Sequence, residues 1–257
     1  MQVEVRLFGG LTERAGGSRV EVALAEPATV ADLRLALTDQ HPSLAPLLPR
    51  VKVAVDLEVA DDEVAVTTDS ELALLPPVAG GAGDEPDEAP VAEAPDGDPG
   101  EPPVTRTRIV TGISAPPLDV AGALSTITGP EVGGTAIFLG TVRDHAPDLD
   151  GVVGLDYSTY PEMAEKVLAD IATEIERDHL DVTGIALLHA VGELDVQDHT
   201  ILIACAAAHR GPAFDACRDA LERVKDRAPV WKRERTADGE HRWVGLHGSE
   251  PAPNAES

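Results

Sequence analysis

Periodic apolar positions predict several strands and one helix in the first 81 residues. Apolar and polar residues alternate over residues 3–7 and again over residues 20–24, which is typical of half-buried strands and predicts a hairpin. Thr29 is suited to cap the helix that follows, and Pro42 ends that helix. Two further strands are predicted at residues 52–57 and 72–75.

Strands and helices alternate in the second half of the chain. Pro161 stands where a first-turn proline belongs, and the apolar residues after it recur on one helical face as far as Ile175. A second helix is predicted from Pro212 to Arg227, and Pro229 stops it. Apolar, β-branched runs predict strands at residues 133–142, 153–157, 185–188 and 200–207.

These patterns predict an α+β protein of two domains, which 257 residues accommodate. One helix against a mixed sheet, over residues 1–81, is the outline of a β-grasp, ubiquitin-like domain. Residues 108–247 predict a larger α+β domain, and residues 248–257 a disordered tail.

An acidic segment separates the two predicted domains. Residues 82–103 hold eight carboxylates and six prolines, with no basic or aromatic residue. Such a composition cannot bury enough apolar surface to offset the entropy of ordering. Residues 82–107 are therefore expected to form a disordered, Pro-rich linker that allows the domains to meet in more than one geometry.

The charge of the chain limits its partners. The formal net charge is −26, so we expect neither nucleic acid nor anionic membrane as a partner. No apolar run approaches the roughly 20 residues of a membrane span, and the N-terminus shows no secretory signal, which favours the cytoplasm. The acidity fits high cytoplasmic salt and a GC-rich genome equally well.

Sulfur and imidazole groups give little sign of a metal site. Cys205 and Cys217 are the only cysteines, too few for a disulfide framework or a four-thiolate zinc site. Both fall in predicted buried elements, so we expect inert packing and not a sulfur relay. The histidines show no tight metal-ligand spacing, and no metal is expected.

Specific motifs resemble a known pair of subunits. Residues 1–81 resemble the small, sulfur-carrying subunit of molybdopterin synthase, with LFGGLTERAG near the start and LLPPVAGG at the end. Residues 108–246 are similar to the large, catalytic subunit, through the stretches GGTAIFLGTVRDH, YSTYPEMAEKVL, AAAHRGPAFDACRDALERVK and APVWKRE. The resemblance implies an α/β-hammerhead fold for the second domain.

The resemblance also implies a sulfurtransferase reaction. Two carriers with a C-terminal glycine thiocarboxylate each donate a sulfur to cyclic pyranopterin monophosphate, which forms the dithiolene of molybdopterin. The pterin is a substrate, and no permanently bound cofactor is expected. Gly81 is implied as the residue that carries the sulfur, because a diglycine without side chains can enter a narrow active site.

The resemblance assigns two lysines to catalysis. Lys225 and Lys232 flank Pro229 and Trp231, so we expect both ammonium groups to reach one cleft. Lys225 is implied as general acid/base or transient acyl acceptor. The substrate-binding residues that the resemblance implies are Thr141, Val142, Arg143, His209, Arg210, Lys225, Lys232, Arg233 and Glu234.

Three of these residues are suited to bind an anion. His209 and Arg210 lie where a predicted strand turns into the second predicted helix, and a helix N-terminus beside cations favours the pterin phosphate or the carrier's carboxylate. Arg143 follows a buried strand and is suited to bidentate contact with phosphate. We expect these residues and the two lysines to converge on one cleft.

The chain departs from the family pattern at Gly81. A peptide bond joins Gly81 to Ala82, so the intact chain cannot be adenylated there. We predict cleavage after Gly81, because the linker is accessible to proteases; the alternative is that another carrier supplies the sulfur. Ser158 stands where Glu is common, Ala190 where Arg is common, and Asp56 where Asn is common.

Two alternative functions remain open from the sequence. The first is a carrier or scaffold protein that has lost catalytic activity, and the second is a sulfur carrier for another thiolation pathway. The leading hypothesis implies an activating enzyme that adenylates and sulfurates the carrier. It also implies a homodimer formed through the catalytic domain.

Overall fold

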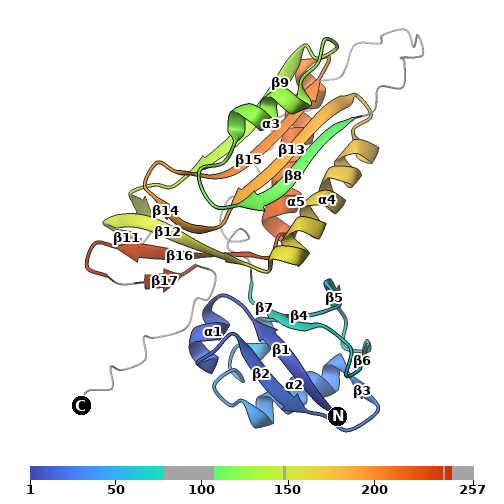
Figure 1. Cartoon of the computed structure of the whole chain (residues 1–257), viewed down its shortest axis with the longest axis vertical. Coiled ribbons are helices and arrows are strands. Elements are labelled where there is room, and N and C mark those ends of the chain that lie inside the picture. Colours follow the sequence, from blue (N-terminus) through green and yellow to red (C-terminus); the bar gives the residue numbers. More distant parts are fainter. Residues whose placement is uncertain (78–106, 147–148, 240, 245–257) are drawn as a thin grey trace.

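The computed structural model describes residues 1–77, 107–146, 149–239 and 241–244 (Figure 1). We call residues 1–77 the N-terminal domain and residues 107–244 the C-terminal domain. Gly81, the predicted linker over most of its length, and the predicted tail lie outside the described residues.

The N-terminal domain is a five-stranded sheet of order β2-β1-β7-β4-β5, with a short β3–β6 ladder beside it. The β1–β2 hairpin is antiparallel, and β1 runs parallel to β7. The elements are β1 (Gln2–Leu7), α1 (Gly10–Ala15), β2 (Arg19–Ala23), β3 (Ala28–Thr29), α2 (Val30–Gln40), a 3-10 turn (Leu48–Arg50), β4 (Lys52–Val55), β5 (Glu58–Ala60), β6 (Ala65–Val66) and β7 (Leu72–Leu75).

Local chemistry explains where helix α2 begins. Thr29 and Asp32 form a reciprocal capping box, in which the Thr29 hydroxyl accepts from the Asp32 amide and the Asp32 carboxylate accepts from the Thr29 amide. The predicted cap is therefore confirmed, and so are the predicted hairpin and the β-grasp fold. The short helix α1 was not predicted.

The C-terminal domain contains two four-stranded sheets, of orders β8-β13-β15-β9 and β14-β12-β16-β17. Its elements are β8 (Arg108–Ser114), α3 (Val120–Ile127), β9 (Gly134–Thr141), β10 (His145–Ala146), β11 (Leu149–Asp150), β12 (Val152–Thr159), α4 (Pro161–Asp178), β13 (Val182–Ala190), β14 (Gly192–Asp195), β15 (His199–Ala207), α5 (Arg210–Arg227), β16 (Val230–Thr236) and β17 (His241–Trp243).

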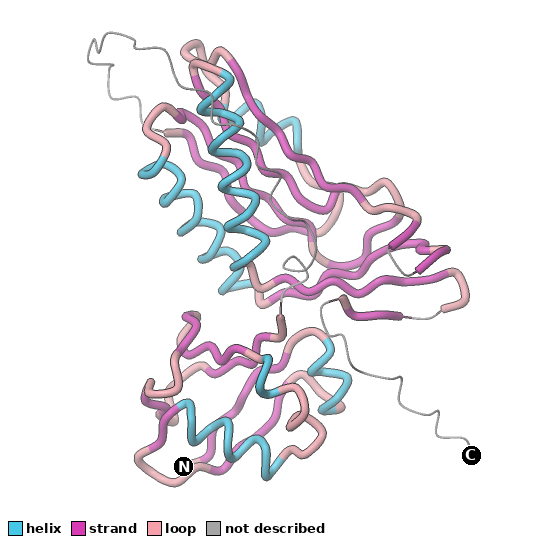
Figure 2. Tube along the Cα trace, turned by 180° about the vertical axis from the view of Figure 1, so that it is seen from behind, coloured by secondary structure: helices cyan, strands magenta, loops and turns pink. Residues whose placement is uncertain are grey.

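Both faces of the β8-β13-β15-β9 sheet are covered. Ile185 and Ile203 pack in one apolar core with α4 and α5, whereas their neighbours Ala186 and Leu202 pack in another core with α3. Figure 2 shows α4 and α5 side by side against this sheet. Coverage on both faces explains the nearly continuous apolar runs of β13 and β15.

The two cysteines lie inside this packing. Cys205 and Cys217 are both buried and unbridged, and burial raises the pKa of both thiols. The predicted burial of both residues is confirmed, and a protonated, buried thiol is a poor nucleophile.

Gly184 on β13 allows α3 to approach the sheet closely. A Cβ added at Gly184 would lie 2.1 Å from the carbonyl oxygen of Ile127, the last residue of α3. We therefore expect Gly184→Ala to lower the free energy of unfolding by about 1–3 kcal/mol, because backbone has to shift. Urea denaturation of the full chain measures this change.

Gly112→Ala on β8 of the same sheet is the matched control. Its added Cβ would meet only Leu188 Cδ2, at 3.9 Å, so we expect a change within about 0.5 kcal/mol. Equal destabilisation by the two substitutions would contradict the close approach of α3.

Candidate active site

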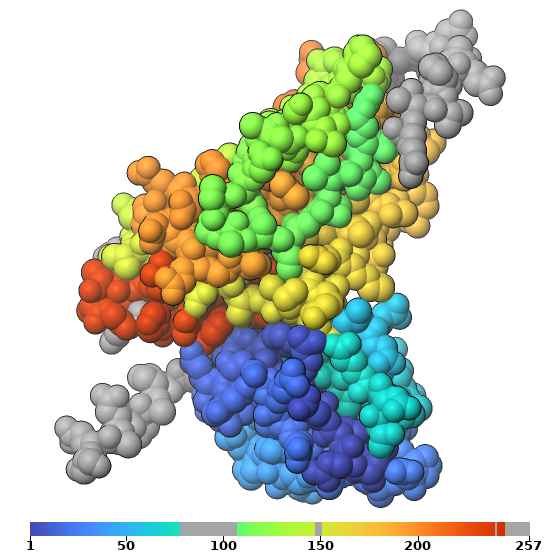
Figure 3. Space-filling model, in the orientation of Figure 1, coloured from blue at the N-terminus to red at the C-terminus, as the bar shows by residue number. Residues whose placement is uncertain are grey.

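Strand β16 of the C-terminal domain lies at the boundary with the N-terminal domain. Its sheet separates the rest of the C-terminal domain from the N-terminal domain, and the N-terminal domain packs against β16 and the start of α4 (Figures 1 and 3). Because successive side chains of a strand point to opposite faces, Trp231 and Arg233 face the N-terminal domain, whereas Lys232 and Glu234 face inward.

Aromatic rings form the centre of the domain contact. Phe8 is the residue after β1. Its ring stacks on Tyr160 at 4.8 Å and on Trp231 at 5.3 Å between centroids. Trp231 Nε1 donates a 2.9 Å hydrogen bond to the carbonyl oxygen of Pro76. Tyr160 and Trp231 are both fully buried. This contact fixes where the tail of the N-terminal domain leaves its last strand, β7.

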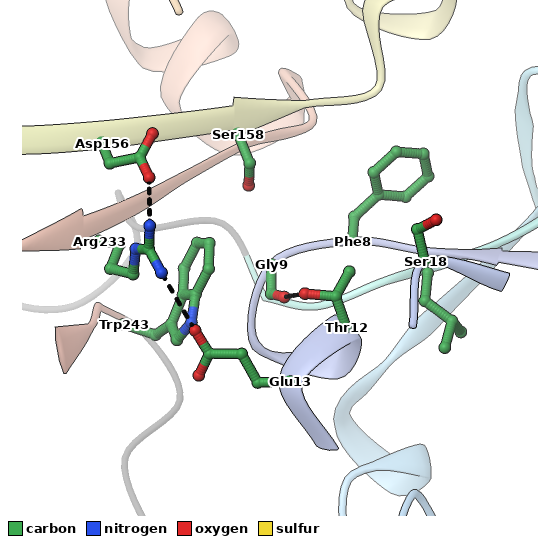
Figure 4. A pocket seen from close by; sticks show the side chains of 10 residues that line it. Phe8, Gly9, Thr12, Glu13, Ser18, Asp156, Ser158, Arg233 and Trp243 are labelled. Carbon is green, nitrogen blue, oxygen red and sulfur yellow. Dashed lines mark hydrogen bonds and ion pairs between the residues drawn. The ribbon is translucent and has the colours of Figure 1, made fainter. Parts of the chain in front are cut away.

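Arg233 takes part in the same contact. Its guanidinium donates to Asp156 at 2.5 Å and, across the domain boundary, to Glu13 at 3.3 Å. It lies beside a pocket of about 370 Å³ between the domains, which Trp243 and Ser158 also line (Figure 4). Arg233 is thus separated from Lys232 by the sheet and engaged by the N-terminal domain.

Ser158, which stands where Glu is common in the family, faces this pocket (Figure 4). Its Oγ is buried and has no hydrogen-bond partner among the residues that the structure describes. Ser158, which pairs with Trp231, therefore lies at the domain boundary and not on the inner face of the sheet.

The inner face of β16 carries a chain of charges. Lys232 Nζ lies 3.4 Å from one carboxylate oxygen of Glu234, and Arg242 on β17 donates to the other at 3.2 Å. Glu234 is only 3% exposed. A buried carboxylate between two cations holds both in place. The sequence reasoning predicted Lys232 and Glu234 but missed Arg242.

Polar side chains continue behind Lys232. Tyr157, its cross-strand neighbour on β12, meets His189 edge to face at 5.0 Å and shares a hydrogen bond with Thr200. Burial raises the pKa of Tyr157 to about 12 and lowers the pKa of His189. At neutral pH both are therefore uncharged, so the charge on this face comes from Lys232, Glu234 and Arg242.

Lys225 lies in the last turn of α5, just before the chain enters β16. It is half-buried and makes no hydrogen bond or ion pair with the described residues. The two predicted catalytic lysines therefore flank the segment that carries Trp231, one held by Glu234 and the other without a partner in the described part of the chain.

His209 and Arg210 lie at the other end of α5. His209 is its N-cap and Arg210 its first residue, and both are exposed. At about 1.5 Å per residue, Arg210 and Lys225 are about 22 Å apart along the helix axis. A single chain therefore does not bring all the predicted cations into one cleft, and this expectation is corrected.

Thr141, Val142 and Arg143 lie where β9 ends. Thr141 pairs with His199 at the start of β15, whereas Gly134 pairs with Ala207 at its end. This part of the chain is therefore at the sheet end away from His209. Arg143 is exposed, and Val142 is buried and bonded through its backbone to residues 197 and 198.

Two further results bear on the class of site. Within the described residues, no group of three or more His, Cys, Asp or Glu side chains is arranged to hold a metal ion. None of the helices described has both the length and the apolar character needed to cross a bilayer.

A β-grasp domain docked at the end of its last strand on a larger α+β domain is the class of two-domain protein that the fold and the site define. Residues 113–227 match the family model of the MoaE protein, and residues 5–81 match that of the ThiS family. The chain belongs to the MoaE family and carries a ThiS-family domain ahead of it. The resemblance to the two subunits of molybdopterin synthase is confirmed, as is the expected pair of folds.

Curated relatives agree with these matches. The chain is 40% identical to molybdopterin synthase catalytic subunit 1 of Mycobacterium tuberculosis, over 50% of this chain and 86% of the relative. It is 36% identical to the catalytic subunit of Halalkalibacterium halodurans, over 50% and 81%. The crystal structure of molybdopterin synthase from Staphylococcus aureus is 31% identical, with a TM-score of 0.48, covering 51% of this chain and 94% of that one.

Gly9 permits the close approach of Trp231 to the N-terminal domain. Its φ is +55°, and an added Cβ would lie 3.2 Å from Trp231 Cγ and 3.3 Å from Pro76 Cγ. We expect Gly9→Ala to weaken docking, because a side chain at this backbone conformation costs about 1–3 kcal/mol and also crowds the indole. Since both tryptophans of the chain lie at this boundary, their fluorescence emission should shift to longer wavelength.

Gly17→Ala in the same domain is the control. Its added Cβ would meet only the Arg19 carbonyl oxygen, at 3.9 Å, and its emission should match that of the parent. An unshifted spectrum for Gly9→Ala would show that the glycine is not required for docking.

Proposed function

We propose that this protein is a molybdopterin synthase of molybdenum cofactor biosynthesis, with carrier and catalytic subunits in one chain. The C-terminal domain transfers sulfur from a thiocarboxylate on Gly81 to cyclic pyranopterin monophosphate. The observation that carries the proposal is the hydrogen bond between Trp231 and Pro76, which holds the start of the carrier's tail on β16, the strand that also carries Lys232. Gly81 lies four residues beyond Pro77, a reach of up to about 14 Å.

The chemistry needs a nucleophilic sulfur and a group that releases it. The thiocarboxylate sulfur forms a bond to a carbon of the pterin side chain, and a C–O bond of that carbon breaks. The oxygen leaves as water or as the ester oxygen of the opened cyclic phosphate, and the product is a thioester. Attack on the acyl carbon by water or by a lysine amine then breaks the acyl–sulfur bond and leaves sulfur on the pterin. A second carrier repeats the step, and two sulfurs complete the dithiolene.

The surroundings of the two lysines support different roles. Lys232, fixed by Glu234, is suited to bind the anionic substrate in a constant position. Lys225 has no partner in the described part of the chain, so its ammonium group is available for proton transfer or acyl capture. Arg242 joins Lys232 through Glu234 and adds positive charge for the phosphate.

A second copy of the chain completes the set of cations in this proposal. Because α5 separates His209 and Arg210 from Lys225, these residues meet the same substrate only if they come from another protomer. The predicted homodimer through the catalytic domain supplies such an arrangement. His209 and Arg210 of one copy would then contact the phosphate of a pterin that is bound near Lys225 of the other.

The carrier has to be released at its C-terminus before it is loaded. Hydrolysis of the Gly81–Ala82 bond gives a glycine carboxylate, which an activating enzyme adenylates and converts to a thiocarboxylate. This enzyme is the partner that the proposal requires. The pterin is the substrate, so no permanently bound cofactor is needed.

Lys225→Ala tests the catalytic role. We expect the rate of molybdopterin formation to fall by about 10²-fold or more, because loss of a general acid or base has that effect. The full chain is produced in a host without its own synthase, and the dithiolene product is quantified by mass spectrometry. The tryptophan emission should stay that of the docked protein.

Lys52→Ala removes an exposed lysine of β4 and is the control, with formation expected within twofold of the parent. A Lys225→Ala protein that makes product at the parent rate would exclude the proposed role. A parent chain that makes none, although docked and supplied with the activating enzyme, would favour the scaffold alternative.

A further inference from the structure

Charged groups surround the aromatic contact between the domains. Arg6 on β1 donates to Glu71 at 2.6 Å and lies 3.6 Å from Glu162 of the C-terminal domain. Its guanidinium carbon lies 4.3 Å from the centre of the Tyr160 ring. The hydroxyl of Tyr160 donates a short hydrogen bond to the same oxygen of Glu71 that Arg6 contacts.

The apolar part of this contact discriminates poorly between partners. Phe8 with Ala54, Ala73 and Leu75 continues the core around Trp231. Burial of apolar surface is non-directional, so any β-grasp domain with an aromatic ring at this position gains similar stabilisation. Discrimination requires groups that are left unpaired when the wrong partner docks.

Tyr160 is such a group. It is fully buried, and burial together with the neighbouring Glu71 carboxylate raises the pKa of its hydroxyl, which therefore remains a hydrogen-bond donor. In the described part of the chain this hydroxyl has one hydrogen bond, to Glu71. A docked domain without an acceptor at that position buries the donor unpaired, which is costly.

The position of Glu71 links recognition at Tyr160 to the strand that leads into the tail. Glu71 immediately precedes β7, the strand that leads into the tail, and Arg6 lies on the neighbouring strand β1. A domain that presents both groups to Tyr160 therefore also presents its tail to Trp231. Recognition at Tyr160 and delivery of the tail are coupled through the β1–β7 pair.

We propose that Tyr160 selects the carrier: the C-terminal domain accepts a β-grasp domain with a carboxylate just before its last strand and an arginine on its first, and disfavours one with apolar groups there. The inference rests on the proposed function, in which a separated carrier docks again after it is loaded. It concerns binding alone, so docking measured without substrate tests it independently of catalysis.

The exchange rate of the Trp231 indole hydrogen with solvent measures docking in the full chain, because this hydrogen is bonded to Pro76. We expect Glu71→Leu to reduce its protection about tenfold or more, since the Tyr160 donor is left unpaired. Adding Tyr160→Phe to Glu71→Leu should restore protection to within about threefold of the parent, since no unpaired donor remains. Glu71→Gln keeps an acceptor and should also stay within threefold.

Glu58→Leu is the matched control. Glu58 is another carboxylate of the N-terminal domain and forms an exposed ion pair with Lys166 of the C-terminal domain, at 3.4 Å. Exposed pairs contribute little, so protection should change less than threefold. Amide exchange of the β1–β2 hairpin in each variant shows whether the N-terminal domain is folded.

Two results would overturn the proposal. One is unchanged protection in Glu71→Leu. The other is protection in the Glu71→Leu, Tyr160→Phe double variant that stays as low as in Glu71→Leu. If Glu71→Leu fails to fold, a Glu71→Gln protein that has lost tenfold or more would overturn it as well.

Discussion

The stacking of Phe8 between Tyr160 and Trp231 is the contact on which the rest of the arrangement depends. It joins a ring from the end of β1 to two fully buried rings of the C-terminal domain. The core of that domain thereby continues into the sheet of the N-terminal domain. With the rings in place, the carbonyl oxygen of Pro76, the residue after β7, accepts a hydrogen bond from the Trp231 indole on β16.

The alternation of side chains along β16 separates two tasks that neighbouring residues perform. Trp231 and Arg233 hold the N-terminal domain, whereas Lys232 and Glu234 face the inner polar cluster. A strand provides this separation at no further cost, because its side chains point alternately to its two faces. Recognition of the carrier can therefore change by substitution on one face while the charges on the other face stay in place.

Periodicity predicted most of the elements. Much of what it missed consists of contacts between residues that are far apart in the sequence. The hairpin, the Thr29 cap and the start of α4 at Pro161 follow from local chemistry and are confirmed. Helix α1 has six residues and begins at a glycine. It is too short to show the periodic apolar pattern of a helix. Phe8 meets Tyr160 only through folding, and Arg242 meets Glu234 only through the register of β16 and β17. The separation of Arg210 from Lys225, in contrast, follows from helix length.

The intact mass of the protein, isolated from a host that is making the cofactor, tests most directly whether the N-terminal domain works as a carrier. A species that ends at Gly81, with a mass increased by the exchange of one oxygen for sulfur, is the predicted result. It would show that the chain is cut and loaded at Gly81, five residues after the Pro76 that Trp231 holds. Full-length chain as the only species under those conditions would contradict this function.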